Sequence, residues 1–448
     1  MILPLSTKLL NFAKILPKPL YVVGGYVRNF LIDKYISSDI DLSSALRVEE
    51  ILPYVEKSGL KVIGEYKRTN TLLLSDGDNK YEFTSFRCDV YSKGHTPVYT
   101  THTDDIKIDA IRRDFKCNAV YYDIKNQKIV DPLGGVEDIK NRVIDTVLAP
   151  EIVFGVDGLR LMRLARFSAE LGFTVKEEVL LGAKLNADKI KDISAERIYT
   201  ELKKILLADE KYPFSPKNAH YNGLKVLDET RVLDRIIPEL TLGRGMIQRA
   251  DYHDYDVLQH SLLTVLYARS DNRISALLHD VGKPYCMNNF GRYKLHDFEG
   301  ENIAVNILKR LKADKKQIKE SAFIVKYHMA GVKKELDVSV MRCLLAQNKE
   351  YAEKLIDILK ADSMAGKNGA VISSSALRWE ELYNKMLSDG TPFTARELNI
   401  KPKDLKSLGV EDKKLGETIN NLLRICQESP EKNQKSTLIE IVKKLQEK

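Results

Sequence analysis

Residues 20–43 read LYVVGGYVRNFLIDKYISSDIDLS and decide the fold of the N-terminal part of the chain. The apolar run at residues 20–23 predicts a buried strand. It ends at Gly24 and Gly25, where backbone without side chains can approach a ligand closely. An amphipathic helix is predicted from residue 26, with Arg28 in its first turn. Backbone N–H groups at a helix start, joined by an arginine, suit a triphosphate.

The sequence DIDL follows at residues 39–42. Because side chains alternate along a strand, Asp39 and Asp41 would share one face and lie about 7 Å apart. Two such carboxylates suit the hard cations of a two-metal phosphoryl-transfer site. A DxD motif alone is usually a solvated turn. A glycine pair, a short helix and a same-face DxD in succession favour a nucleotidyl-transfer site instead.

The composition is that of a soluble protein with more than one domain. The chain has 448 residues, of which 44% are hydrophobic and 30% charged, so we expect roughly two to four domains. The net charge of +8 is compatible with a polyanionic partner and equally with a mildly basic cytosolic protein. The five cysteines form no CxxC pair, which indicates reduced thiols in the cytoplasm.

The N-terminal residues lack the unbroken apolar core of a signal peptide. No window approaches about 18 apolar residues, so no membrane span is expected. We therefore predict a cytoplasmic location, without a membrane and without an obligate protein partner.

A change of pattern along the chain predicts an α+β protein. Up to about residue 145 the pattern mixes strands and helices, and beyond residue 151 long helical patterns take over. The predicted strands are residues 68–74, 81–86, 119–122 and 128–130, and the first predicted helices of the second part are residues 155–171 and 195–207. The chain is thus predicted to have a small mixed α/β head followed by an all-helical body.

Three features of the head have alternative interpretations. Glu82 would be a third carboxylate at the metals if its strand neighbours the DIDL strand, and is otherwise an exposed strand glutamate. Residues 88–109 are polar and long enough for a mobile functional loop. Arg112, Arg113 and Asp114, predicted at a helix start, could hold a phosphate and a ribose hydroxyl, or could form surface ion pairs.

Asp157 and Arg160 fall in the predicted helix 155–171, one turn apart on the same face, with Arg163 and Arg166 near that stripe. An aspartate acceptor beside an arginine donor can read the Watson–Crick edge of a base. The alternative is an intrahelical salt bridge worth roughly 0.2–0.5 kcal/mol.

Six motifs occur in the order seen in class II tRNA nucleotidyltransferases and bacterial poly(A) polymerases, and the sequence resembles the CCA-adding enzymes. The motifs are GGYVRN, DID, RRDF with NA two residues later, DPLGG, DGLRLMRLARF and SAERIYTEL. The resemblance runs through most of the chain and ends in DLKSLGVEDKKLGETINNLL, which is similar to the family's tRNA-binding tail. It implies four parts: a polymerase-beta-like head at residues 1–145, a base-recognising helical neck at 146–215, a helical body with an HD domain at 216–375 and a helical tRNA-binding tail at 376–448.

The resemblance also implies roles for the residues of the head. Asp39 and Asp41 would bind two Mg²⁺ ions, and Gly24, Gly25 and Arg28 would hold the triphosphate. The terminal 3′-hydroxyl of tRNA would then attack the α-phosphate of CTP or ATP, and pyrophosphate would leave.

Further roles follow from the same resemblance. Arg113 and Asp114 would contact the triphosphate and the ribose. Asp157 and Arg160 would read cytosine or adenine, so that the protein itself serves as the template. The remaining nucleotide-binding candidates in these motifs are Asn118, Arg163 and Arg166. Residues 88–109 would correspond to the flexible loop that acts in the switch from C to A addition.

The sequence departs from the family pattern at three places. Val156 stands where the family usually has Glu, Lys116 and Cys117 replace Thr-Ile, and residues 94–97 read GHTP in place of a more basic motif. The sequence therefore leaves three alternatives: addition of full CCA, of CC alone or of A alone. A poly(A) polymerase that adds only A is a further alternative.

A second group of motifs resembles the HD-domain phosphohydrolases: YHDYDVLQHSLLTVL, SALLHDVGKP, YKLHDFEG, IVKYHM and LKADSMA. Their candidate ligands are His260, His279, Asp280, His296, His328 and Asp362. Neutral imidazoles with carboxylates suit a divalent transition metal, whose bound water would hydrolyse phosphoesters. The alternatives are a scaffold that only binds RNA, or a mainly hydrolytic HD phosphodiesterase whose head has become an RNA-binding module.

Overall fold

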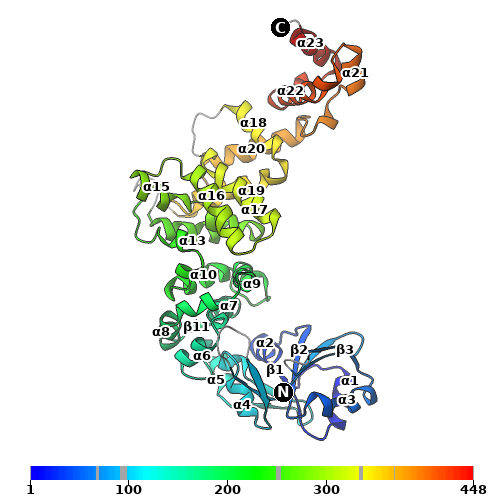
Figure 1. Ribbon diagram of the computed structural model, residues 1–448, viewed down its shortest axis with the longest axis vertical. Coiled ribbons are helices and arrows are strands. Elements are labelled where there is room, and N and C mark those ends of the chain that lie inside the picture. The colour runs from blue at the N-terminus through cyan, green and yellow to red at the C-terminus, as the bar shows by residue number, and fades with distance from the viewer. Residues whose placement is uncertain are drawn as a thin grey trace. The chain divides into compact units, whose positions relative to one another are not determined.

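The computed structural model describes residues 2–66, 70–90, 98–248, 254–331, 337–367 and 369–446. The chain forms two compact units, Met1–Ile237 and Pro238–Lys448. In Figure 1 the first unit runs from blue to green and the second from green to red. The division into four parts that we drew from the sequence stays a prediction.

The head begins with the predicted strand, helix and strand. These are β1 (Leu20–Val23), α2 (Gly25–Asp33) and β2 (Asp39–Ser44). Along β2 the burial alternates, since Ile40 and Leu42 are buried while Asp39 and Asp41 are exposed. The same-face arrangement of the two aspartates is therefore confirmed, and the apolar face of the strand anchors it in the core.

A seven-stranded sheet carries these elements, in the order β3-β4-β5-β2-β1-β8-β9. Its other strands are β3 (Lys61–Tyr66), β4 (Thr71–Ser75), β5 (Lys80–Ser85), β8 (Tyr121–Asp123) and β9 (Lys128–Val130). β4 pairs with β5 and β8 with β9, both antiparallel, so the four predicted strands form two hairpins. Residues 68 and 69 of the first predicted strand lie outside the described residues. β2 and β5 are parallel. Helices α1 (Thr7–Ile15) and α3 (Val48–Lys57) also belong to the head.

The prediction of a loop over residues 88–109 is wrong for its described part. β6 (Arg87–Val90) pairs with β7 (Tyr99–His102), and α4 (Ile106–Ile111) follows. Residues 91–97, which include the GHTP motif, lie outside the described residues. The RRD motif is also not at a helix start: Arg112 caps the C-terminal end of α4.

A set of helices continues the first unit beyond the sheet (Figure 1). They are α5 (Gly135–Asn141), α6 (Pro150–Val156), α7 (Leu159–Leu171), α8 (Glu177–Leu185), α9 (Ala195–Leu206), α10 (Ala219–Glu229) and α11 (Leu233–Ile236), with the short parallel pair β10 (Val143–Ile144) and β11 (Thr174–Val175). α10, which the sequence analysis assigned to the body, packs on α7 and α9. The prediction of α9 is confirmed, but the single helix predicted over 155–171 is wrong. The backbone leaves the helix at Asp157, where φ is −143°, and resumes it at Leu159.

The second unit is built from helices in its described residues. They are α12 (Pro238–Thr241), α13 (Val257–Tyr267), α14 (Arg273–Leu278), α15 (Gly282–Phe290), α16 (His296–Arg310), α17 (Lys315–Tyr327), α18 (Val338–Gln347), α19 (Lys349–Met364), α20 (Ser374–Ser388), α21 (Pro402–Ser407), α22 (Leu415–Glu428) and α23 (Lys435–Gln446). Trp379 centres an apolar cluster of α18, α19 and α20. Leu405, Leu422 and Leu438 join the last three helices.

Two findings concern the chain as a whole. All five cysteines are free thiols, as the absence of CxxC pairs predicted. Among the described residues, no helix combines the length and the apolar character needed to cross a bilayer. Together with the mixed head and the helical remainder, the α+β class predicted from the sequence is confirmed.

Candidate functional site

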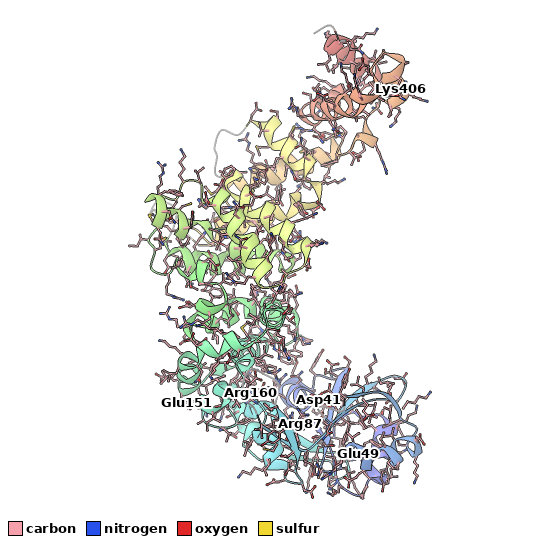
Figure 2. The ribbon with its side chains drawn as sticks, in the orientation of Figure 1. Asp41, Glu49, Arg87, Glu151, Arg160 and Lys406 are labelled. Carbon is pink, nitrogen blue, oxygen red and sulfur yellow. The ribbon has the colours of Figure 1, made fainter. Side chains whose placement is uncertain are left out.

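A polar cleft of about 450 Å³ lies in the first unit, where the glycine turn, β2 and the RRD motif face α7. Figure 2 labels Asp41 and Arg160, which line it from β2 and α7 respectively. Each of the arginines that line the cleft comes from one of the six motifs: Arg28, Arg112, Arg113, Arg160, Arg163, Arg166 and Arg197. The size falls in the range of small-molecule sites, and the charge suits a polyphosphate.

The glycine turn and the DxD carboxylates are in close contact. Gly24 has φ +78°, and a Cβ placed on it would lie 3.3 Å from Oδ2 of Asp41 and 3.9 Å from Nη1 of Arg113. A side chain at residue 24 would therefore adopt a rare backbone conformation and fill the space beside the carboxylate. On the other side of Asp41, Glu82 is its register partner in the parallel β2–β5 pair. Glu82 thus has the position predicted for a third carboxylate.

The negative charges of these carboxylates repel one another. The Asp41 side chain is open to the cleft but has protein around it, and this partial desolvation raises its pKa; Arg113 acts in the opposite direction, and the charge of Asp39 raises the pKa further. Burial likewise raises the pKa of Glu82, and the charges of Asp41 and Asp39 add to this. A patch of three oxygen donors whose ionised forms repel each other matches the ligand chemistry of a hard divalent cation such as Mg²⁺.

Asp109 orients both arginines of the RRD motif, and sequence reasoning missed it. Its carboxylate is fully buried and accepts hydrogen bonds from Nε of Arg112 at 2.7 Å, from Nη2 of Arg113 at 3.3 Å and from the hydroxyl of Tyr121 at 2.7 Å. Burial opposes the ionised form, but the arginines outweigh it and lower the pKa of Asp109. The spacing of three and four residues between Asp109 and the arginines was the available signal.

Asp114 links the head to α7. Its carboxylate accepts hydrogen bonds from Nε of Arg163 at 2.7 Å and from Nδ2 of Asn118 at 3.0 Å. Arg163 is therefore engaged by Asp114 and does not extend an open base-reading stripe. Burial disfavours the ionised form of Asp114, but Arg163 and Asn118 more than compensate and hold its pKa well below the usual range.

Arg28 is buried beneath the cleft and already has partners. Its Nε and Nη2 donate to Oδ1 of Asn29 at 3.0 and 2.9 Å, and its Nη1 donates to Oδ1 of Asn118. The Arg28 guanidinium also lies 5.0 Å from the ring centre of Phe167, which Arg163 and Arg166 approach at 5.1 and 4.4 Å. Only a small part of this guanidinium is left for a triphosphate.

Asp157 and Arg160 are brought together, although not within one helix. Oδ1 of Asp157 accepts a hydrogen bond from the backbone N–H of Leu159 at 2.9 Å and so caps α7. Nε of Arg160 lies 3.8 Å from Oδ2 of Asp157, and Nη2 of Arg160 donates to the carbonyl of Arg112 at 2.5 Å. The pair is thus fixed at the N-terminal end of α7 and tied to the RRD motif.

The replacements in the RRDF motif have structural partners. Nζ of Lys116 lies 2.6 Å from Oδ2 of Asp145, which also accepts Nζ of Lys176 at 2.8 Å. Lys116 therefore ties the head to the start of α8. Cys117 is fully buried, and burial raises the pKa of its thiol to about 12, so this thiol is chemically inert.

The depressed pKa of Asp114 has a consequence for acid stability. A carboxylate whose pKa is lower in the folded chain than in the unfolded chain stabilises the fold above the unfolded pKa, and this is lost as pH falls toward the folded value. We therefore expect the free energy of unfolding of Asp114→Asn to fall less steeply with decreasing pH than that of the wild-type protein below about pH 4. The two slopes should differ by up to about 1.4 kcal/mol per pH unit. Urea unfolding at pH 5, 4 and 3 measures this. The exposed Asp192 provides the control Asp192→Asn, and equal pH slopes for both variants would contradict the assignment.

The HD candidates converge in the second unit. Four are histidines at helix ends or on helix faces: His260 on α13, His279 after α14, His296 at the start of α16 and His328 after α17. Two groups have ligand atoms within 4.8 Å of one another, His260 with His279 and Asp362, and Asp280 with His296 and His328. Asp280 also lies close to His260 and His279 of the first group, so all six predicted residues form one cluster.

The carboxylate of Asp280 lies at the centre of this cluster. Its Oδ2 is 3.5 Å from Nε2 of His260 and 3.3 Å from Nε2 of His279, and its Oδ1 is 3.2 Å from Nε2 of His296 and 3.4 Å from Nε2 of His328. Nζ of Lys283 lies 2.6 Å from Oδ2, and both carboxylate oxygens are buried.

The Nδ1 atoms of the four histidines face backbone carbonyls, at 3.3 Å for His260, 2.8 Å for His279, 2.8 Å for His296 and 2.6 Å for His328. A carbonyl can only accept, so each Nδ1 carries the proton and each Nε2 of a neutral ring presents a lone pair to the cluster. Burial alone would lower the pKa of His279, but Asp280 and Asp362 raise it to about 10. The cluster therefore attracts positive charge.

Residues 20–145 match the family described as "Poly A polymerase head domain", and residues 172–242 match "Probable RNA and SrmB- binding site of polymerase A". A CCA-adding enzyme of Lactobacillus helveticus is 37% identical over 186 residues, which are 41% of this chain and 45% of the relative. Over this part the chain is similar to a CCA-adding enzyme. An A-adding tRNA nucleotidyltransferase of Deinococcus radiodurans is 32% identical over 288 residues, 60% of this chain and 62% of the relative. The chain thus spans about half to three-fifths of these relatives' lengths.

The fold agrees over nearly the whole chain. The crystal structure of the Bacillus stearothermophilus CCA-adding enzyme in complex with CTP has a TM-score of 0.66 at 22% identity, covering 99% of this chain and 98% of that one. The Thermotoga maritima CCA-adding enzyme complexed with tRNA has a TM-score of 0.62 at 17% identity, covering 97% and 93%. The fold predicted from the resemblance is therefore confirmed.

Proposed function

We propose that the protein is a tRNA nucleotidyltransferase that adds C, C and A to the 3′ end of tRNA from CTP and ATP without a nucleic-acid template. The observation that carries this proposal is the contact of Gly24 with Asp41, which sets a side-chain-free turn against paired carboxylates in an arginine-lined cleft. The relatives named above and the fold they share support the same activity.

The residues of the cleft divide the work of the reaction. The backbone at Gly24 and Gly25 and the guanidinium of Arg113 bind and orient the triphosphate of CTP or ATP. The carboxylate and guanidinium of Asp157 and Arg160 select the base by accepting and donating hydrogen bonds along its Watson–Crick edge. Binding thereby sets the α-phosphate in line with the 3′-hydroxyl of tRNA, which contributes to catalysis by orientation.

Asp39, Asp41 and Glu82 would hold the Mg²⁺ ions of this family. Their repelling charges fit such ions, as the raised pKa values of Asp41 and Glu82 indicate. When bound, a pair of divalent ions supplies charge stabilisation for the attacking and the leaving oxygen of an in-line displacement.

The test is addition to tRNAs that end before CCA, after C and after CC, each with labelled CTP, ATP, UTP or GTP and Mg²⁺. Stepwise C, C and A followed by a stop is the expected product, resolved at single nucleotides. Addition of A only to the CC end would make the protein an A-adding enzyme, like its Deinococcus radiodurans relative. C without A would make it a CC-adding enzyme, and long A tails would make it a poly(A) polymerase.

A second proposal concerns the HD cluster, which would bind divalent transition metal ions and hydrolyse phosphoesters. The observation that favours it is the set of four imidazole Nε2 atoms directed at Asp280 and Asp362. When bound, such an ion would activate a water molecule at neutral pH. Asp362 is the one of the six residues with a partly exposed side chain, 19%, and so lies on the side from which a phosphoester would approach.

We expect the wild-type protein to retain bound metal after incubation with Mn²⁺ or Ni²⁺ and desalting. The metal content of His279→Ala should be lower by at least about tenfold, since removal of a ligand weakens such a site. Metal analysis by mass spectrometry measures the content, and hydrolysis of bis-p-nitrophenyl phosphate measures the activity. His102→Ala on β7 is the control histidine. Equal metal content in both variants would contradict the site. Hydrolysis without any nucleotide addition would favour an HD phosphodiesterase with an RNA-binding head.

A further inference from the structure

The cleft continues along α7 beyond the residues that the proposed function uses. Asp157 and Arg160 lie at the N-terminal end of this helix, and Glu170 lines the cleft near its C-terminal end. Ten residues of helix between Arg160 and Glu170 correspond to about 15 Å. The two ends therefore contact different parts of whatever fills the cleft. Lys211 and Tyr212 line the end at Glu170.

Glu170 is a buried carboxylate without a donor. The residue is 2% exposed, and within the described part of the chain its carboxylate has no hydrogen bond or ion pair. Burial raises its pKa, while the charges of Arg166, Arg28 and Lys211 act in the opposite direction. Leaving a buried acceptor unpaired costs free energy. A carboxylate of this kind that lines a cleft is suited to a donor on the ligand.

The neighbours of Glu170 indicate which ligand this is. Lys211 and Arg166 supply positive charge for a phosphate. The half-buried ring of Tyr212 is stacked on Phe214, with ring centres 5.0 Å apart and planes 11° apart. A fixed aromatic ring beside basic groups is typical of sites that hold an unpaired nucleotide of RNA. The carboxylate repels phosphate, so it faces a hydroxyl or an amino group of that nucleotide.

The proposed reaction restricts which group of the nucleotide can donate a hydrogen bond to Glu170. Amino groups differ between bases, and the acceptor end changes its base with every addition of C, C and A. The 3′-hydroxyl is the attacking group and must reach the carboxylates of β2. The 2′-hydroxyl of the terminal ribose is the donor that every acceptor end presents, and it is also the group that distinguishes RNA from DNA.

We propose that Glu170 accepts a hydrogen bond from the 2′-hydroxyl of the 3′-terminal nucleotide of the acceptor RNA. Lys211 and Tyr212 complete the binding site for this nucleotide. The incoming nucleotide occupies the opposite end of α7, at Asp157 and Arg160. This inference rests on the proposed transferase function, because it assigns the acceptor of that reaction. Glu170 would position the 3′ end of the acceptor RNA without distinguishing its base.

The test combines a change in the protein with a change in the RNA. A tRNA ending in CC is prepared with a ribose or with a 2′-fluoro sugar at its terminal nucleotide, which keeps a similar sugar shape but cannot donate. For the wild-type protein we expect the 2′-fluoro end to raise KM for tRNA about tenfold, the size typical of a hydrogen bond to a charged group. Glu170→Gln keeps only a neutral acceptor, so it should raise KM for the ribose end, and the additional effect of the 2′-fluoro end should be smaller than in the wild-type protein.

Several outcomes would overturn the assignment. The two changes could multiply, which would mean that they act independently. A rise confined to KM for ATP would mean that Glu170 contacts the incoming nucleotide and not the acceptor RNA. A wild-type protein indifferent to the 2′-fluoro end would also exclude the contact, and this arm needs no variant. Glu177→Gln, on the exposed start of α8, is the matched control and should leave both KM values unchanged.

Two measurements separate this inference from the proposed function. Equilibrium binding of the two tRNAs, followed by fluorescence anisotropy without any nucleotide, reports the contact even if no addition occurs. Thermal unfolding distinguishes a structural role, because Glu170→Gln removes an unpaired buried charge and should not lower the midpoint. A lowered midpoint with unchanged discrimination between the two tRNAs would make Glu170 a structural residue and overturn the inference.

Discussion

Asp41→Asn is expected to abolish addition of both C and A, with kcat lower by about 10³-fold or more. Asp41 lies between the glycine turn and Glu82, so its carboxylate is central to any cation held there. Loss of a metal ligand removes several kcal/mol of transition-state stabilisation, which corresponds to this factor. Because both nucleotides use the same carboxylates, the loss should not depend on which is added. Single-turnover addition to tRNAs ending in C and in CC measures it.

The fold of the Asp41→Asn variant should be intact. The charge of Asp41 raises the pKa of Glu82, so its removal relieves repulsion, and the thermal midpoint should stay the same or rise. The control is Asp192→Asn, an exposed aspartate outside the cleft, which should keep full activity. Retention of either addition by Asp41→Asn, or by Asp39→Ala, would show that these carboxylates do not hold the catalytic ions.

Gly158→Ala is expected to destabilise the first unit by about 3 kcal/mol, or roughly 6–12 °C in its thermal midpoint. A Cβ on Gly158 would lie 2.1 Å from the carbonyl oxygen and 2.6 Å from the carbonyl carbon of Lys189. These are backbone atoms, which cannot rotate away as a side chain can. The displaced segment carries Asp157 and Arg160, so base selection should be lost as well.

Gly155 provides the matched control for this prediction. It lies three residues earlier, in α6, and a Cβ there would meet only Oδ1 of Asn186 at 3.6 Å, an ordinary contact. Gly155→Ala should therefore leave stability unchanged or raise it by up to about 1 kcal/mol through helix propensity. Differential scanning calorimetry of both variants measures the difference. Equal midpoints would mean that the approach of α7 to residue 189 is not close in solution.

The strand, helix and strand that begin at residue 20 were predictable because burial and periodicity act locally. The four-residue apolar run and the alternation in DIDL each specify an element without reference to the rest of the chain. β3 was missed because Lys61–Tyr66 forms an edge strand with both faces largely exposed, so its sequence shows no burial pattern. The break at Asp157 was missed because the helical periodicity continues across it, while the close approach of Gly158 to Lys189 depends on a distant segment.

The site was predictable where a motif carried it, and less so where partners came from elsewhere. The positions of Asp39 and Asp41 follow from strand alternation, whereas the position of Glu82 depends on the pairing of β2 with β5, which the sequence left open. The engagement of Arg163 by Asp114 could not be derived, because 49 residues separate them. Glu170 had no signal at all, since a glutamate near a helix end is ordinary until its surroundings are known.

The backbone hydrogen bonds of the four cluster histidines have a consequence for how the cluster would acquire the proposed cation. For His279, His296 and His328 the accepting carbonyl belongs to the residue three positions earlier in the sequence. Each ring is therefore oriented by its own local backbone, and the lone pairs are pre-organised before an ion arrives. If the cluster binds a metal ion as proposed, uptake and release would need no refolding, and affinity would be governed by competition between metal ions and protons, with tighter binding as pH rises.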